Sequence, residues 1–155
     1  MPRVIVAADD DEDDIDLLKL LFRKAGITQP LEVFRHGEEL IESLQHRLKK
    51  AAAALPMLCL LDVKMPGISG HDVLRWIRGQ SRLDAMPVVM VSSSELPDDV
   101  KLAAEQGAQC YLAKYPQPSV LRRLVDEAQN FAQGPTAGTW FGLPANLLLR
   151  WGLAG

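Results

Sequence analysis

The chain has 155 residues, of which 48% are hydrophobic and 24% are charged, and its formal net charge is −3 at pH 7. This length and apolar content predict one soluble domain with a hydrophobic core. The slightly acidic balance provides no basic surface, and no apolar run reaches the roughly eighteen residues of a membrane span, so we expect neither a nucleic-acid nor a membrane partner. The N-terminus lacks the pattern of a signal peptide, and we expect a cytoplasmic protein.

Five short apolar runs, rich in β-branched residues, alternate with segments of helical periodicity. The runs cover residues 4–8, 31–34, 58–61, 88–91 and 110–113, and we predict a strand at each. Apolar residues at helical spacing lie within 15–22, 40–48, 73–77, 100–103 and 121–131. Gly26 and Gly107 stand just past expected helix ends. Pro97 and Pro118 stand where helices would begin. The alanine run 51–54 is predicted to be the tail of the second helix.

The predicted strands show almost no polar alternation, which is typical of strands buried on both faces of a parallel sheet. The alternation of strand and helix then predicts a doubly wound α/β fold with helices on both faces of the sheet. In such sheets ligands bind outside the carboxyl ends of the strands. Functional side chains are therefore expected directly after each strand.

The cysteines and histidines give no sign of chemistry. Cys59 and Cys110 each lie in an apolar run, so we expect small buried residues with free thiols. The three histidines share no metal-ligand spacing, and none can be paired with a nucleophile. We expect all of them at the surface: His36, His46 and His71.

Acidic residues follow the first and third predicted strands. The first strand runs into six consecutive acidic residues, from Asp9 to Asp14, and the third is followed at once by Asp62. Asp9 and Asp10 come straight off the strand end, where side chains face the crevice above the sheet. The next four acidic residues are interpreted as the start of a helix, stabilised by the positive end of its dipole. Asp9, Asp10 and Asp62 are therefore the candidate site carboxylates.

Converging carboxylates must be separated by water or by a metal ion. A hard divalent cation suits oxygen ligands, and Mg²⁺ is favoured because it accepts one or two protein carboxylates and leaves room for a phosphate. Such an ion neutralises the incoming phosphoryl oxygens, so that a neighbouring carboxylate can attack phosphorus. Asp62 is the predicted nucleophile.

Two further polar residues stand directly at strand ends. Ser92 follows the fourth strand, and Lys114 follows the fifth. A hydroxyl and a cation are the groups expected to hydrogen-bond and pair with phosphoryl oxygens. The connectivity of a parallel sheet brings both to the same edge as Asp9, Asp10 and Asp62. The combination therefore predicts one phosphoryl-binding site.

This ordered set resembles the receiver domain of two-component response regulators, over roughly residues 3 to 132. Asp62 lies in the matching context LLDVKMPGISG. The resemblance implies a flavodoxin-like sheet of five parallel strands in the order 2-1-3-4-5. It also implies a receiver domain at 1–132, with residues 133–155 as a C-terminal extension.

The resemblance assigns a role to each matching residue. Asp62 corresponds to the phosphoacceptor, and Asp10 and Asp62 would bind Mg²⁺ directly together with the backbone carbonyl of Lys64. Asp9 would act on the ion partly through water. Two positions correspond to the switch residues of the family, the hydroxyl position and the aromatic position: Ser92 and Tyr111. The family's lysine corresponds to Lys114.

Two features set this chain apart within the resemblance. The family usually has proline directly after the lysine, often with a cis bond, whereas here Tyr115 intervenes before Pro116. Whether the Tyr115-Pro116 bond is cis is left open. The long segment 37–56, with its HRLKK sequence, resembles the single-domain receivers that are paired with phytochrome-type kinases.

The resemblance implies a signalling protein and not an enzyme. A sensor histidine kinase, of phytochrome type by the subfamily likeness, would transfer a phosphoryl group to Asp62. Phosphorylation would then alter the surface of the fourth helix, fifth strand and fifth helix. Because about twenty residues after Phe131 cannot build an output domain, we expect signalling through partners, and this surface is one place where a homodimer could form.

Two other functions compete with this interpretation. A phosphatase of the haloacid dehalogenase type also uses an aspartate nucleophile, Mg²⁺ and a lysine, but it places an acid two residues after the nucleophile, where this chain has Lys64. Turnover without that acid should be slow. The second alternative is a receiver-like binding module that signals without phosphorylation.

The C-terminal extension contains an apolar cluster: Trp140, Phe141, Leu147, Leu148, Leu149 and Trp151. It could pack on its own domain, or it could reach a second copy as a dimer arm. Both interpretations stay open.

Overall fold

The computed structural model describes residues 3–93 and 96–130. The strands are β1 (Ile5–Ala8), β2 (Leu31–Phe34), β3 (Leu58–Leu61), β4 (Val88–Ser92) and β5 (Cys110–Ala113). The α-helices are α1 (Glu12–Lys24), α2 (Gly37–Leu48), α3 (Gly70–Arg78), α4 (Pro97–Glu105) and α5 (Pro118–Asn130). Two short 3-10 helices, η1 (Ala52–Ala54) and η2 (Ser81–Leu83), complete the set. The predicted extension 133–155 lies outside the described residues.

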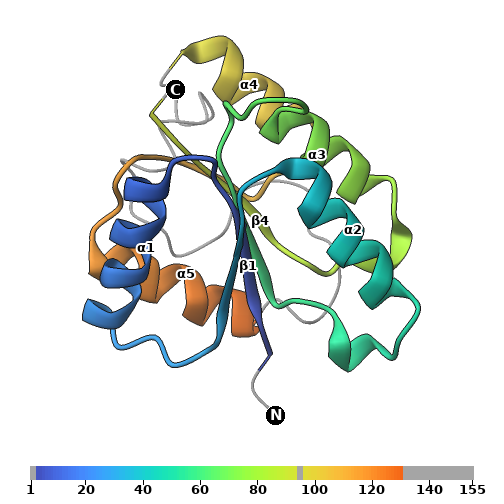
Figure 1. The fold of residues 1–155 in the computed structure, drawn as a ribbon, viewed down its shortest axis with the longest axis horizontal. Coiled ribbons are helices and arrows are strands. Elements are labelled where there is room, and N and C mark those ends of the chain that lie inside the picture. Colours follow the sequence, from blue (N-terminus) through green and yellow to red (C-terminus); the bar gives the residue numbers. More distant parts are fainter. Residues whose placement is uncertain (1–2, 94–95, 131–155) are drawn as a thin grey trace.

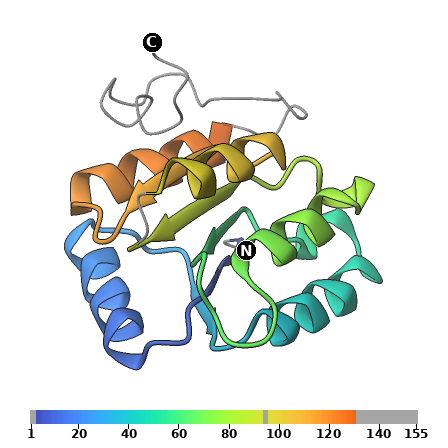
Figure 2. The same cartoon turned by 90° about the horizontal axis from the view of Figure 1, so that it is seen from above.

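The five strands form one parallel sheet in the order β2-β1-β3-β4-β5. Figure 1 shows α1 and α5 on one side of the sheet and α2 and α3 on the other, and Figure 2 shows the same layers from above. The predicted doubly wound fold and its strand order are therefore confirmed. No helix among the described residues is long and apolar enough to cross a membrane.

Strand pairing brings the predicted site residues to one level of the sheet. Ala8 pairs with Leu61, so the residues that follow them leave neighbouring strands side by side. Ser92 pairs with Ala113, so Lys114 leaves β5 beside the end of β4. Backbone hydrogen bonds continue past the strands: Asp62 N donates to Ala8 O over 3.0 Å, and Lys114 N to Ser92 O over 2.9 Å. Hydrogen bonds of the sheet therefore hold the backbone in place at Asp62 and Lys114.

The helix ends lie where the capping residues, prolines and glycines of the sequence predict them. The Asp11 side chain caps α1 by accepting from the amides of Asp13 and Asp14, which explains part of the acidic block. Prolines open α4 and α5. Gly26 and Gly107 have φ values of 70° and 93°, a conformation that favours glycine after a helix.

The prediction that the alanine run 51–54 continues the second helix was wrong. α2 ends at Leu48, and the run forms the separate turn η1. The Arg47 guanidinium donates to Ala54 O over 2.8 Å, and that of Arg3 donates to Leu55 O over 3.2 Å. These bonds fold the chain back toward β3, because Met57 must enter the sheet beside Val4. Tertiary contacts therefore override the helix propensity of alanine.

The core lies on both faces of the sheet, and every residue of β1, β3 and β4 is buried. Cys59 and Cys110 are buried free thiols, as expected. Their strands are separated by β4, so the two residues do not face each other across a strand pair. Burial raises the pKa of both thiols to about 12, which makes them unreactive at neutral pH.

Gly70 allows the loop after β3 to fold tightly over the strand end. A Cβ at this position would lie 2.1 Å from the carbonyl oxygen of Asp62, which is a backbone atom that cannot move away alone. We therefore expect Gly70→Ala to lower the free energy of unfolding by about 3 kcal/mol in urea titrations. The control is Gly79→Ala, where the nearest atom is 3.3 Å away and φ is −78°. Equal stability of the two variants would contradict this account.

Candidate functional site

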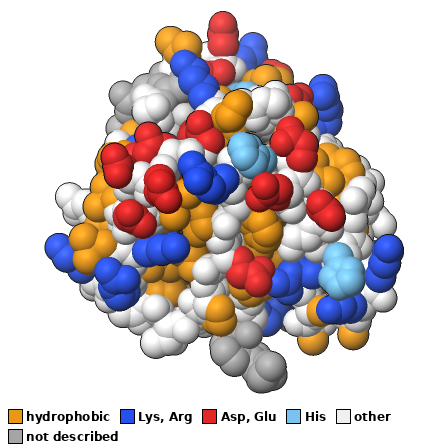
Figure 3. Space-filling model, in the orientation of Figure 1, with side chains coloured by type: hydrophobic (Ala, Val, Ile, Leu, Met, Phe, Trp, Pro, Cys, Tyr) orange, Lys and Arg blue, Asp and Glu red, His pale blue; other side chains and the backbone are white. Residues whose placement is uncertain are grey.

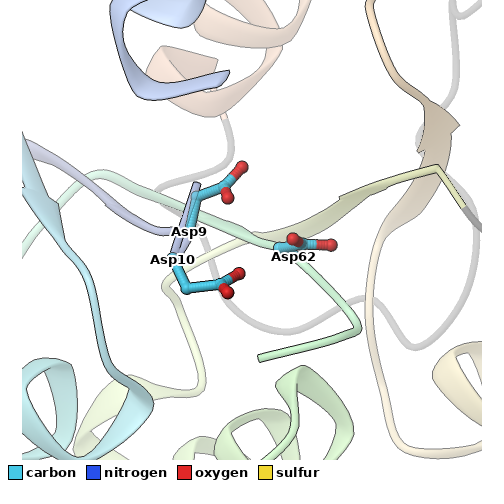
Figure 4. A group of neighbouring side chains, drawn as sticks. All are labelled: Asp9, Asp10 and Asp62. Atoms are coloured by element: carbon cyan, nitrogen blue, oxygen red, sulfur yellow. The ribbon is translucent and has the colours of Figure 1, made fainter. Parts of the chain in front are cut away.

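Asp9 and Asp62 lie side by side at the carboxyl ends of β1 and β3. Both are buried, with 8% and 7% of their surface exposed. Asp10 follows Asp9 and is half-buried. Carboxylate oxygens of all three lie within 4.8 Å of one another. Figure 4 shows Asp9 and Asp10 at the end of one strand with Asp62 across from them. The predicted carboxylate cluster is thus formed.

Lys114 reaches into this cluster from the end of β5. Its Nζ lies 2.8 Å from Asp9 Oδ2 and 3.1 Å from Asp62 Oδ2. Only 7% of the lysine side chain is exposed. Burial alone would lower the pKa of Lys114, but hydrogen bonds and charge interactions with the carboxylates outweigh burial and raise it. The lysine is therefore a permanent positive charge at the site.

Asp14 is a further member of the site, although the sequence was interpreted to place it only at the start of a helix. Its Oδ2 lies 2.7 Å from Lys114 Nζ, and its Oδ1 accepts a hydrogen bond from the Tyr115 hydroxyl. Asp14 belongs to the first turn of α1, which begins at the rim of the crevice. One signal was present in the sequence: Asp14 stands one helical turn after Asp10, a spacing that puts two residues on the same side.

Burial dominates the electrostatics of Asp62. It raises the pKa of this carboxyl, and the neighbouring charge of Asp9 raises it further. Lys114 and the backbone N–H of Lys64 act in the opposite direction without cancelling the rise. The ionised form of Asp62 is thus less stable than that of an exposed aspartate, which leaves it in need of additional positive charge.

The pH dependence of stability follows from the raised pKa of Asp62. Folding favours the protonated carboxyl, so the wild type loses stability as the pH rises from about 4 through the folded-state pKa. Asp62→Asn has no such loss. We expect this variant to be more stable than the wild type at pH 7 without metal ions, with the difference vanishing in acid. Urea unfolding across this pH range tests it, with the exposed Asp16→Asn as control; a constant difference would contradict the pKa assignment.

The two predicted switch residues are both buried. Ser92 ends β4 with none of its surface exposed, and Tyr111 lies within β5 with 1% exposed. Tyr111 pairs with Met90 across the sheet.

The turn after Lys114 contains a cis peptide bond, and it lies one residue before the Tyr115-Pro116 bond that the sequence left open. Among the described residues, the cis peptide bond is Lys114–Tyr115, and Tyr115–Pro116 is trans. Tyr115 is half exposed, with its hydroxyl on Asp14.

A pocket adjoins the carboxylate cluster on the side of α3 and α4. It is lined by Asp10, Val63, Lys64, Met65, Pro66, Ser69, His71 and Asp99. His71 was expected at the surface, but it is 8% exposed, and its Nε2 lies 3.5 Å from Asp99 Oδ1. The prediction was wrong because His71 lies in the first turn of α3, which packs against α4. His36 and His46 are exposed, as expected.

The donor set fits a hard divalent cation. Three carboxylates present oxygen atoms close together, and one of them, Asp10, also lines the neighbouring pocket and remains accessible. Figure 3 shows that Asp and Glu side chains gather on the upper half of the molecule, where Figure 1 places the carboxyl ends of the strands. This arrangement favours Mg²⁺ or Mn²⁺, which prefer oxygen ligands.

Comparison with known families decides the assignment. The model of the response regulator receiver domain matches residues 5–126, most of the chain. The chain belongs to this receiver family. Receiver domains serve two-component signalling, and they bind Mg²⁺ or Mn²⁺ at an acidic pocket, as the carboxylate cluster here would require.

Several receivers of known structure resemble the chain over most of its length. Response regulator Rcp1 of Synechocystis is 29% identical over 84% of this chain and 88% of its own, and its Mn²⁺-bound structure superposes with a TM-score of 0.65. RPA3017, a response regulator in red light signalling of R. palustris, is 26% identical with a TM-score of 0.72 and covers 88% and 99%. The phosphorylated cyanobacterial phytochrome response regulator RcpA is 27% identical with a TM-score of 0.67 and covers 85% and 94%.

Proposed function

We propose that this receiver accepts a phosphoryl group on Asp62 from a histidine kinase and signals through a changed protein-interaction surface. The observation that carries the proposal is the contact of Lys114 with Asp62 beside Asp9 and Asp10. It combines a buried nucleophile, a cation for the phosphoryl oxygens and an acidic ion site. The phosphatase alternative gains no support from the relatives, and Lys64 occupies the place of its general acid.

The chemistry is a transfer between two nucleophiles. An Oδ of Asp62 attacks phosphorus in line, an O–P bond forms, and the P–N bond to the kinase histidine breaks. The electron pair of that bond stays on the imidazole nitrogen, and the product is an acyl phosphate. Lys114 donates to the phosphoryl oxygens and stabilises the charge they carry in the transition state. Water later cleaves the acyl phosphate and restores Asp62.

The ion site has a defined place in this scheme. Asp10, Asp62 and the carbonyl of Lys64 would hold Mg²⁺, with Asp9 acting through water. When bound, the ion supplies positive charge to the phosphoryl oxygens. The amide of Lys64 already donates to Asp62, so the loop after β3 orients the nucleophile from its own backbone.

The response would spread from the strand ends to α4 and α5. Ser92 would follow the new phosphoryl oxygens, and Tyr111 would change its packing within β5. Both are buried at rest, so a movement of either would require their neighbours to repack. The surface of α4, β5 and α5 would then present a different face to a downstream protein or to a second copy.

The partner is proposed to be a phytochrome-type histidine kinase. The relatives that support this include a phytochrome response regulator and one in red light signalling. The test is transfer of labelled phosphoryl from such a kinase, phosphorylated on its histidine, to the wild type and to Asp62→Asn. We expect label on the wild type only, and none in the presence of EDTA. Label from acetyl phosphate without transfer from such kinases would refute the partner and leave the function intact.

A further inference from the structure

Asp14 is one of the carboxylates that hold Lys114 at rest. An ammonium has three N–H donors. Nζ of Lys114 lies within 3.1 Å of three carboxylates, those of Asp9, Asp14 and Asp62. The side chain is therefore fully engaged, and a phosphoryl oxygen on Asp62 must take over one of these donors.

The three carboxylates are not equivalent in this exchange. Asp62 would become an acyl phosphate, and an ion at the predicted site would offset the charge of Asp9. Asp14 stands outside the cluster whose oxygens lie within 4.8 Å of one another. Its other oxygen accepts from the Tyr115 hydroxyl, which orients the carboxylate on Lys114. Asp14 thus keeps its negative charge on Lys114 while the phosphoryl group arrives.

We propose that Asp14 is a positioning residue that competes with the phosphoryl group for Lys114 and so limits how readily the receiver is activated. The inference rests on the proposed function of Asp62. The Asp14 side chain is 18% exposed, so solvent screens its charge only in part. Asp14 and Tyr115 line one pocket with Asp9, Asp62 and Lys114, which places the competing carboxylate in the same pocket as the nucleophile.

The experiment measures binding of beryllofluoride, a mimic of the phosphoryl group on a carboxylate, at saturating Mg²⁺. We expect Asp14→Asn to bind beryllofluoride about tenfold more tightly than the wild type, because a repelling charge is removed and Lys114 is released. The same variant should bind Mg²⁺ a few-fold more weakly without beryllofluoride, because the cluster loses negative charge and Lys114 turns to Asp9 and Asp62. Opposite changes in the two affinities cannot arise from a loss of structure.

Two further variants complete the test. Asp13→Asn removes an equal charge from an exposed position in the same helical turn, and should leave both affinities within about twofold of the wild type. Tyr115→Phe should tighten beryllofluoride binding less than Asp14→Asn, and should add nothing in the double variant, because the hydroxyl acts through Asp14.

Unchanged or weaker beryllofluoride binding by Asp14→Asn, or equal tightening by Asp13→Asn, would overturn the inference. If the wild type itself fails to bind beryllofluoride, the proposed function fails and the inference fails with it. Binding by the wild type without tightening in Asp14→Asn would refute the role of Asp14 alone.

Discussion

Replacing Lys114 by methionine is expected to slow phosphorylation of Asp62 by at least about a hundredfold. Nζ is the cation in contact with Asp62, and it is the group available to stabilise charge on the phosphoryl oxygens as the transfer proceeds. The measurement is the rate of labelling by acetyl phosphate at saturating Mg²⁺. A wild-type rate in Lys114→Met would remove the lysine from the mechanism.

The same variant should also be less stable than the wild type. Loss of the lysine ammonium leaves Asp9, Asp14 and Asp62 without their shared cation. Removing one partner of a buried ion pair lowers the free energy of unfolding by about 3 kcal/mol. Mg²⁺ should restore part of this stability by binding the carboxylates. The control is Lys101→Met, an exposed lysine 4.0 Å from Glu105, which should cost less than about 1 kcal/mol. Equal stability of both variants would contradict the geometry.

Asp10→Asn is expected to weaken Mg²⁺ binding by at least about tenfold. The substitution removes one oxygen charge from the carboxylate cluster while keeping the size of the side chain. Isothermal titration calorimetry gives the affinity, and the rise in melting temperature with added Mg²⁺ gives an independent measure. Asp13→Asn is the matched control, because it lies at the exposed start of α1. Unaltered affinity in Asp10→Asn would place the ion elsewhere.

Most of the fold could be predicted because each strand is recognisable in the sequence as a short apolar run. A run such as LCLL has no polar residue, and every residue of it is buried. The predicted and observed bounds of β2, β3 and β5 coincide, and β1 and β4 differ by one residue at an end. The alanine run 51–54 was misassigned because the bonds that unwind it come from Arg3 and Arg47, which lie outside the run.

The site could be predicted where it depends on strand ends. Asp9, Asp62 and Lys114 follow strands directly, so the parallel connectivity alone brings them together. Asp14 could not be separated from its acidic neighbours in the same way. Its role depends on the entry angle of α1 and on Tyr115 across the crevice, which are set by packing. The burial of His71 likewise depends on how α4 lies against α3.

The most direct test of the account is the intact mass of the protein after treatment with acetyl phosphate and Mg²⁺. The wild type should gain one phosphoryl group, and Asp62→Asn should gain none. Asp126→Asn, which alters an aspartate on α5 whose side chain is half exposed, should gain one like the wild type. A phosphoryl group on Asp62→Asn at the wild-type level would contradict the assignment of Asp62 as the phosphoacceptor.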